Sequence, residues 1–139
     1  GWTALMEAAY NCEETVTWAL LEARAGVDVR DEDGRTALML AAGHGTDAVA
    51  RALIKAGAGV DVQTQRGWTA LMEAAYNCEE TVTWALLEAR AGVDVRDEDG
   101  RTALMLAAGH GTDAVARALI KAGAGVDVQT QRGWTALME

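Results

Sequence analysis

The feature that most constrains this chain is an internal repeat. Residues 1–66 recur unchanged as residues 67–132, and residues 133–139 begin the same text again. Each 66-residue block also divides into two related halves of 33 residues, in which GWTALMEAA aligns with GRTALMLAA and TVTWALLEARAGVDV aligns with AVARALIKAGAGVDV. A fixed period of this length is typical of proteins in which one supersecondary unit stacks on the next. We therefore expect a single array with full units at 1–33, 34–66, 67–99 and 100–132 and a partial unit at 133–139.

The apolar spacing within each unit predicts two short helices. In the first unit, apolar residues shared by both halves recur three or four positions apart in residues 4–11 and again in residues 14–24, which is the spacing of one helix face. Thr3 is placed to N-cap the first helix, and Thr46 to cap the second helix of the second unit. Gly57 can end that helix in a left-handed conformation. The expected fold class is all-α, a solenoid of helix-turn-helix repeats with extended loops.

Several segments that fall in phase resemble the ankyrin repeat family. TALMEAA and TALMLAA are similar to its T-P-L-H-x-A-A opening, GAGVDV to its G-A-D-V-N closing, and Asp31–Gly34 to its D-x-x-G finger turn. The resemblance covers the whole chain and implies an ankyrin-type solenoid. Three departures carry expectations of their own. Ala4 replaces the family's Pro, and Met6 replaces a His that links neighbouring turns by hydrogen bonds. Arg24 stands where Gly is usual, so we expect the first unit to close its second helix differently.

The family register also implies which residues contact a partner, because ankyrin repeats bind through the finger turns and the exposed face of the first helix. The predicted partner-binding residues are Trp2, Tyr10, Asp33, Arg35, Arg66, Trp68, Tyr76, Asp99, Arg101, Arg132 and Trp134. Since Trp and Arg are enriched in interface hot spots, the three indoles are the expected anchors. The alternative is that these indoles pack across neighbouring fingers. Trp18 and Trp84 fall on the outer side of the second helix, where they form either a second contact face or a cover for the adjacent helix.

Charge narrows the class of partner. The formal net charge of −9 disfavours nucleic acid, and no apolar run approaches the length of a membrane span. The first unit carries −6 and the second +2. This alternation suits either contact between two arrays or stabilisation between successive units of one array. The expected partner is a protein, either another chain or a copy of this one.

No pattern in the chain indicates catalysis, a cofactor or a metal. No P-loop, CxxC pair or HExxH is present. The two histidines, His44 and His110, lie two units apart, too far to share a metal ion, and we interpret His44 as structural. Cys12 and Cys78 are separated likewise, so we expect each to be a small buried residue. Asp31–Gly34 matches only part of a calcium loop, and we interpret it as an acidic turn.

Identity between the blocks bears on function, because identical repeats present one epitope many times. That arrangement suits a periodic partner, a multivalent partner or a copy of the chain itself. We expect a non-enzymatic protein-protein interaction scaffold, seen here as a window of a longer or multivalent array. The alternative is a self-assembling structural protein. Units 1–33 and 100–132 carry the same interior-type residues as the middle ones, and uncapped repeats of this kind can stack head to tail into a filament, a homo-polymer.

Overall fold

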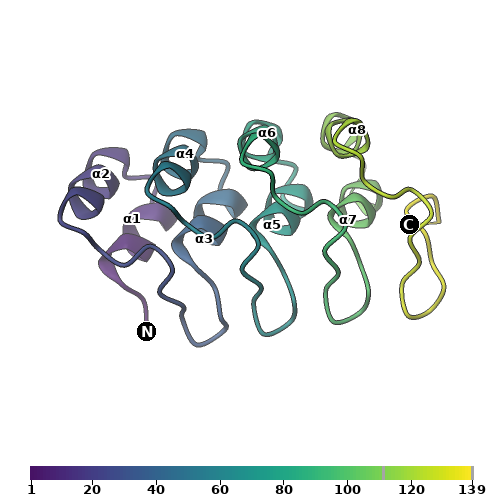
Figure 1. The fold of residues 1–139 in the computed structure, drawn as a ribbon, viewed down its shortest axis with the longest axis horizontal. Helices are drawn as coiled ribbons and strands as arrows, with labels where there is room; N and C mark the ends of the chain where they lie inside the picture. Colours follow the sequence, from purple (N-terminus) through teal and green to yellow (C-terminus); the bar gives the residue numbers. More distant parts are fainter. Residues whose placement is uncertain (111, 139) are drawn as a thin grey trace.

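The chain folds as two parallel rows of helices with extended loops below them (Figure 1). The computed structural model describes residues 1–110 and 112–138; Glu139, the last residue of the predicted partial unit, lies outside these. The first helices of the four units are α1 (Ala4–Tyr10), α3 (Ala37–Gly43), α5 (Ala70–Tyr76) and α7 (Ala103–Gly109). The second helices are α2 (Glu14–Glu22), α4 (Asp47–Lys55), α6 (Glu80–Glu88) and α8 (Asp113–Lys121). The all-α fold of stacked helix-turn-helix repeats is confirmed.

The first helix of each unit begins as the sequence predicts. The Thr3 hydroxyl accepts a hydrogen bond from the Met6 backbone N–H at 3.2 Å, and Thr36 accepts one from Met39 at 3.4 Å. Each bond satisfies one of the backbone donors that a helix start leaves unpaired. Extended backbone at both threonines then directs the chain from the loop into the helix.

The second helices begin differently from the prediction, and two expectations are corrected here. Thr46 is the N-cap residue of α4, but its side chain makes no capping hydrogen bond. Its Oγ1 instead lies 2.8 Å from the Sγ of Cys12, in the preceding unit. Cys12 is exposed rather than buried, as is its copy Cys78. The reason is the backbone: Cys12 has a φ of 61°, in the tight turn between α1 and α2.

The expectation that Arg24 would close α2 differently is wrong. Arg24 adopts a φ of 62°, the left-handed conformation that Gly57 adopts after α4 with a φ of 93°. The backbone N–H of Arg24 donates to Leu21 at 3.0 Å, and that of Gly57 donates to Ile54 at 3.0 Å. Both units therefore end their second helix in the same way. An L-residue with a Cβ pays a conformational cost there that glycine does not.

The core lies between the two rows and runs through the length of the array. Leucines of the first helices, such as Leu38 and Leu71, are almost fully buried because each first helix packs on the next. The exact repeat supplies an internal comparison. Val82 on α6 is 0% exposed, whereas its identical copy Val16 on α2 is 47% exposed. Since α6 packs against α4, burial of this valine depends on a preceding repeat. After α8, residues 136–138 form a turn.

Candidate interaction face

Two kinds of finger loop alternate along the array. In the acidic finger, Asp31 Oδ1 accepts backbone N–H bonds from Asp33 at 3.0 Å and Arg35 at 2.8 Å. In the next finger a threonine takes the place of the aspartate, and Thr64 Oγ1 accepts from the Trp68 backbone N–H at 3.0 Å. The acidic finger recurs at 97–101 and the threonine finger at 130–134, each with equivalent bonds. Short polar side chains thus fold both turns locally.

Neighbouring fingers are tied to one another by backbone hydrogen bonds. Gln65 N–H donates to the Asp33 carbonyl at 3.1 Å, and Glu98 N–H donates to the Arg66 carbonyl at 2.9 Å. The Gln65 side-chain amide adds a bond to the Glu32 carbonyl at 2.6 Å. With Met in place of the family's His, these contacts connect the turns. The fingers are consequently held in register before any partner arrives, which lowers the ordering cost of binding.

The Asp31 carboxylate shows how this surface holds an anion. Its Oδ2 accepts from the Trp2 indole N–H at 3.0 Å and from Arg35 Nε at 2.8 Å. Burial raises the pKa of Asp31, but the backbone and side-chain hydrogen bonds from Arg35 and the indole bond together hold it below the ordinary value. The guanidinium carbon of Arg35 also lies 5.6 Å from the centroid of the Trp2 ring. Trp2 therefore packs across to the next finger and is half-buried.

An aromatic row runs along the fingers and first helices. The ring of Tyr10 lies 5.1 Å from that of Trp2 and 4.3 Å from that of His44, between centroids. The identical row in the next block joins Trp68, Tyr76 and His110, with separations of 5.3 and 4.3 Å. His44 Nδ1 also lies 3.0 Å from the Leu40 carbonyl, which orients the ring.

Sequence reasoning missed the two histidines as part of this surface. The signal that could have found them is their position. His44 follows Tyr10 by 34 residues, one full period plus one, and so lies beside it on the next repeat. We call the surface made by the fingers and the exposed ends of the first helices the finger face. It contains the eleven predicted partner-binding residues, together with His44 and His110.

Two pockets that share six equivalent lining positions open on the finger face. One, of about 400 Å³, is lined by Asp33, Arg35, Thr64, Gln65, Arg66 and Trp68, and also by Glu73 of α5 and by Glu98, Asp99 and Arg101 of the next finger. The other, of about 480 Å³, is lined by the copies Asp99, Arg101, Thr130, Gln131, Arg132 and Trp134. We call these the arginine pockets. They lie between an acidic finger and the threonine finger that follows, and so recur every two repeats.

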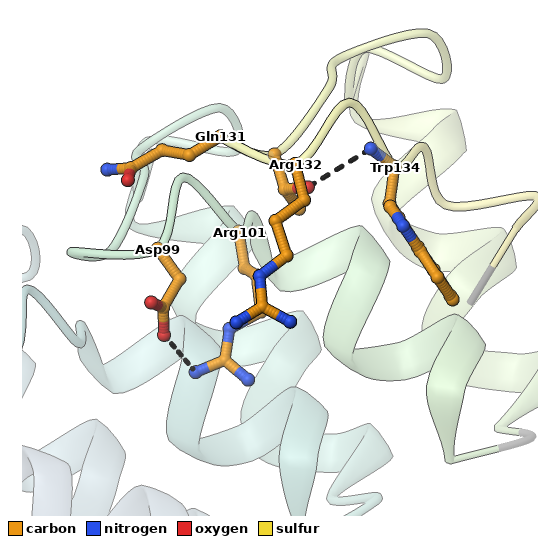
Figure 2. A pocket seen from close by; sticks show the side chains of 6 residues that line it. Asp99, Arg101, Gln131, Arg132 and Trp134 are labelled. Carbon is orange, nitrogen blue, oxygen red and sulfur yellow. Dashed lines mark hydrogen bonds and ion pairs between the residues drawn. The ribbon is translucent and has the colours of Figure 1, made fainter.

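The two guanidinium groups at the equivalent positions of both pockets differ in their ion-pair partners. Arg101 contacts the Asp97 carboxylate at 2.9 Å and Asp99 at 3.5 Å. Among the residues that the structure describes, Arg132 and its copy Arg66 form no ion pair. Figure 2 shows the Arg101 and Arg132 side chains reaching into the same space, with the Trp134 indole beside them. The lining of the second pocket therefore carries one surplus positive charge, from Arg132, whereas the lining of the first also includes the carboxylates of Glu73, Glu98 and Asp99.

Glu73 lies at the edge of the first arginine pocket, on α5. Burial raises the pKa of its carboxyl group, while the charges of Arg35 and His44 partly oppose that increase. Its copy Glu7, on α1, is exposed. The same residue is thus desolvated only where a preceding repeat covers it.

Trp18 and Trp84 lie apart from the finger face, on the row of second helices (Figure 1). Each side chain is 37% exposed. Lys55 of α4 places its ammonium nitrogen 6.0 Å from the centroid of the Trp18 ring. The indole thus contacts the adjacent helix on one side and solvent on the other. Trp18 and Trp84 therefore belong to a different surface from the tryptophans of the finger face.

Opposite charges on successive units form an ion pair between their second helices. Arg51 of α4 contacts Asp47 on its own helix and Glu88 of α6, both at 2.9 Å. In the part of the chain that the structure describes, no group of His, Cys, Asp and Glu side chains is placed to hold a metal ion. No described helix is both long and apolar enough to cross a membrane.

Comparison with known proteins agrees with the fold. The sequence model of the family described as ankyrin repeats (3 copies) matches residues 5–97 and 83–139. No curated protein matches the chain.

Proposed function

The chain belongs to the ankyrin repeat family, a generally non-catalytic family that typically mediates protein-protein interaction, and from that premise we propose that it is a non-enzymatic scaffold whose finger face binds a protein. Units 1–33, 34–66, 67–99 and 100–132 with the partial unit 133–139 act as one module. The observation that carries the proposal is the row of half-buried indoles, exposed phenols and arginines on fingers that hydrogen bonds already hold in place. Aromatic and arginine side chains on a rigid support are the composition of interface hot spots.

The assignment of Trp2, Tyr10, Trp68, Tyr76 and their neighbours to the partner rests on their position. Tyr76 is exposed at the end of α5, beside Trp68 and His110. Trp18 and Trp84, each 37% exposed, offer a second contact face.

A site-specific crosslinking experiment tests the finger face. A photoreactive amino acid replaces Tyr76 in one variant, and in the matched control it replaces Thr81, which is exposed on α6. After irradiation in an extract of the source cells, we expect discrete protein adducts from position 76 and none from position 81. Equal labelling at both positions, or no adduct from any finger-face position, would contradict the proposal.

A second candidate function is self-assembly into a head-to-tail polymer. The observation that favours it is the exposure of Val16 on α2. The identical Val82 is buried on α6, which packs against α4 of the preceding repeat. A second chain could supply that cover. Electron microscopy of the purified chain would then show filaments, and Val16→Asp would abolish them. Sedimentation as a monomer at high concentration would rule this candidate out.

A further inference from the structure

The two arginine pockets lie a fixed distance apart, so a ligand that fills both must have its binding side chains at the same distance. They are two repeats apart, and each repeat adds one helix-packing distance of about 8–10 Å, so the interval is about 16–20 Å. An extended peptide advances about 3.3 Å per residue, and its side chains alternate between two faces. Side chains that enter both pockets must therefore be separated by an even number of residues. Six residues span about 20 Å, whereas four span only about 13 Å.

The charge of the pockets selects the chemistry of those side chains. In the lining that both pockets share, the one acid, Asp33 or Asp99, already contacts an arginine. Arg66 and Arg132 contribute the remaining charge, which is positive. The backbone of Arg66 is held in place, because its carbonyl oxygen accepts a hydrogen bond from a backbone N–H of the next finger. A carboxylate is the group that a guanidinium fork binds best among protein side chains.

The same surface contains an example of this recognition. The Asp31 carboxylate lies between the Trp2 indole N–H and Arg35 Nε, with 3.0 and 2.8 Å contacts. Each arginine pocket has the same two residue types, Arg66 with Trp68 and Arg132 with Trp134. At Asp31 the indole and the guanidinium come from successive fingers, whereas in each pocket they lie two positions apart on one finger, so what the pockets share with this example is the pair of residue types.

We propose that the two arginine pockets together bind an extended acidic segment of a partner protein, with carboxylates at positions i and i+6. The proposal rests on the finger face being the interaction surface. Glu73, Glu98 and Asp99 at the border of the first pocket oppose an acidic ligand and make that pocket the weaker of the two. The chain's net charge of −9 would instead attract a basic segment, so the two occupants give opposite results in the experiment below.

The experiment measures the binding of four labelled ten-residue peptides by fluorescence anisotropy. The uncharged host of Ser, Ala and Gly carries Glu at positions 2 and 8, Glu at 2 and 5, Lys at 2 and 8, or phosphoserine at 2 and 8. The first two have the same charge, but side chains three apart point to opposite faces and reach only one pocket. Since an exposed ion pair is worth up to about fivefold in affinity, we expect Glu at 2 and 8 to bind about fivefold tighter than Glu at 2 and 5.

Variants of the chain assign the effect to the pockets. Arg66→Ala with Arg132→Ala should remove the preference for the six-residue spacing. The matched control, Arg24→Ala with Arg90→Ala, removes the same charge two repeats apart outside the pockets and should keep it. Glu73→Gln should tighten the acidic peptide. Thermal melts check that every variant is folded.

Three results would overturn the inference: equal binding of the two Glu spacings, tighter binding of the Lys peptide, or loss of binding in the Arg24 and Arg90 control. Much tighter binding of the phosphoserine peptide would replace the carboxylate by a phosphorylated segment and overturn that assignment. If position 76 crosslinks to a partner while the peptides show no spacing preference, the finger-face function stands and this inference fails. If no finger-face position crosslinks, the function itself fails.

Discussion

Arg90 ends α6 in a backbone conformation that suits glycine, and replacing it should stabilise the fold. Its φ is 62°, and the identical Arg24 also has a φ of 62°. A left-handed conformation costs an L-residue about 1–2 kcal/mol. Glycine avoids that cost but loses more conformational freedom on folding, which offsets about 0.5–1 kcal/mol. Arg90→Gly should therefore raise the free energy of unfolding by about 0.5–1 kcal/mol.

Thermal and urea unfolding followed by circular dichroism measure this change. For a chain of this length, the expected gain corresponds to a rise in Tm of about 2–5 °C. The repeat supplies the reverse experiment at Gly57, with a φ of 93° and no atom within 4 Å of where a Cβ would stand. Gly57→Ala should lose stability for conformational reasons alone. An unchanged or lower Tm for Arg90→Gly, with an unchanged urea m-value, would refute the reasoning.

Of three further predictions, the first two use the exact repeat as their control. Val82→Ala should cost about 2 kcal/mol, from two buried methyl groups and the cavity they leave, whereas Val16→Ala should cost less than about 1 kcal/mol; equal losses in urea unfolding would contradict the burial of Val82. Glu73→Gln should stabilise the fold at pH 7, because burial raises the pKa of the Glu73 carboxyl. The gain in stability should vanish as the pH falls and Glu73 takes up a proton, and Glu7→Gln is the exposed control in the same pH series. Asp31→Asn should destabilise the fold at pH 7, and the difference from wild type should shrink as the pH falls through the lowered pKa of Asp31; a difference that does not change with pH would show that charge is not its cause.

The fold could be predicted from sequence because the strongest signals act at the level of the repeat. The 33-residue period and the apolar spacing at Leu5, Ala8 and Ala9 set the helix pairs, and Thr3 caps its helix as a residue of that type should. The failures concern residues judged by type alone. Cys12 was expected in the core because cysteine is usually buried, yet a left-handed turn places it at the surface. Arg24 was expected to change the helix end, but it aligns with Gly57 and adopts the same left-handed backbone.

The residues of the candidate site could be named from the sequence, but their grouping into pockets could not. The family register places Asp33, Arg35, Arg66 and Trp68 on fingers, but it does not show which of them lie together. Their grouping follows from contacts between one finger and the next, such as the bond from Gln65 to the Asp33 carbonyl. Those contacts span a whole repeat, and local patterns of apolar and polar residues contain no information about them.

Exact duplication acts on this surface in a way that a single pocket would not reveal. Because the 66-residue block contains two unlike fingers, the arginine pockets recur at every second repeat and not at every repeat. Each pocket alone offers an exposed, individually weak contact. Two contacts on one ligand are strengthened only when the ligand's spacing matches that of the pockets, since the second then forms at a high effective concentration. A substitution that weakens either pocket should therefore reduce the preference of the whole chain for the matched ligand spacing. For that reason the spacing of the ligand is a sharper test than its affinity alone.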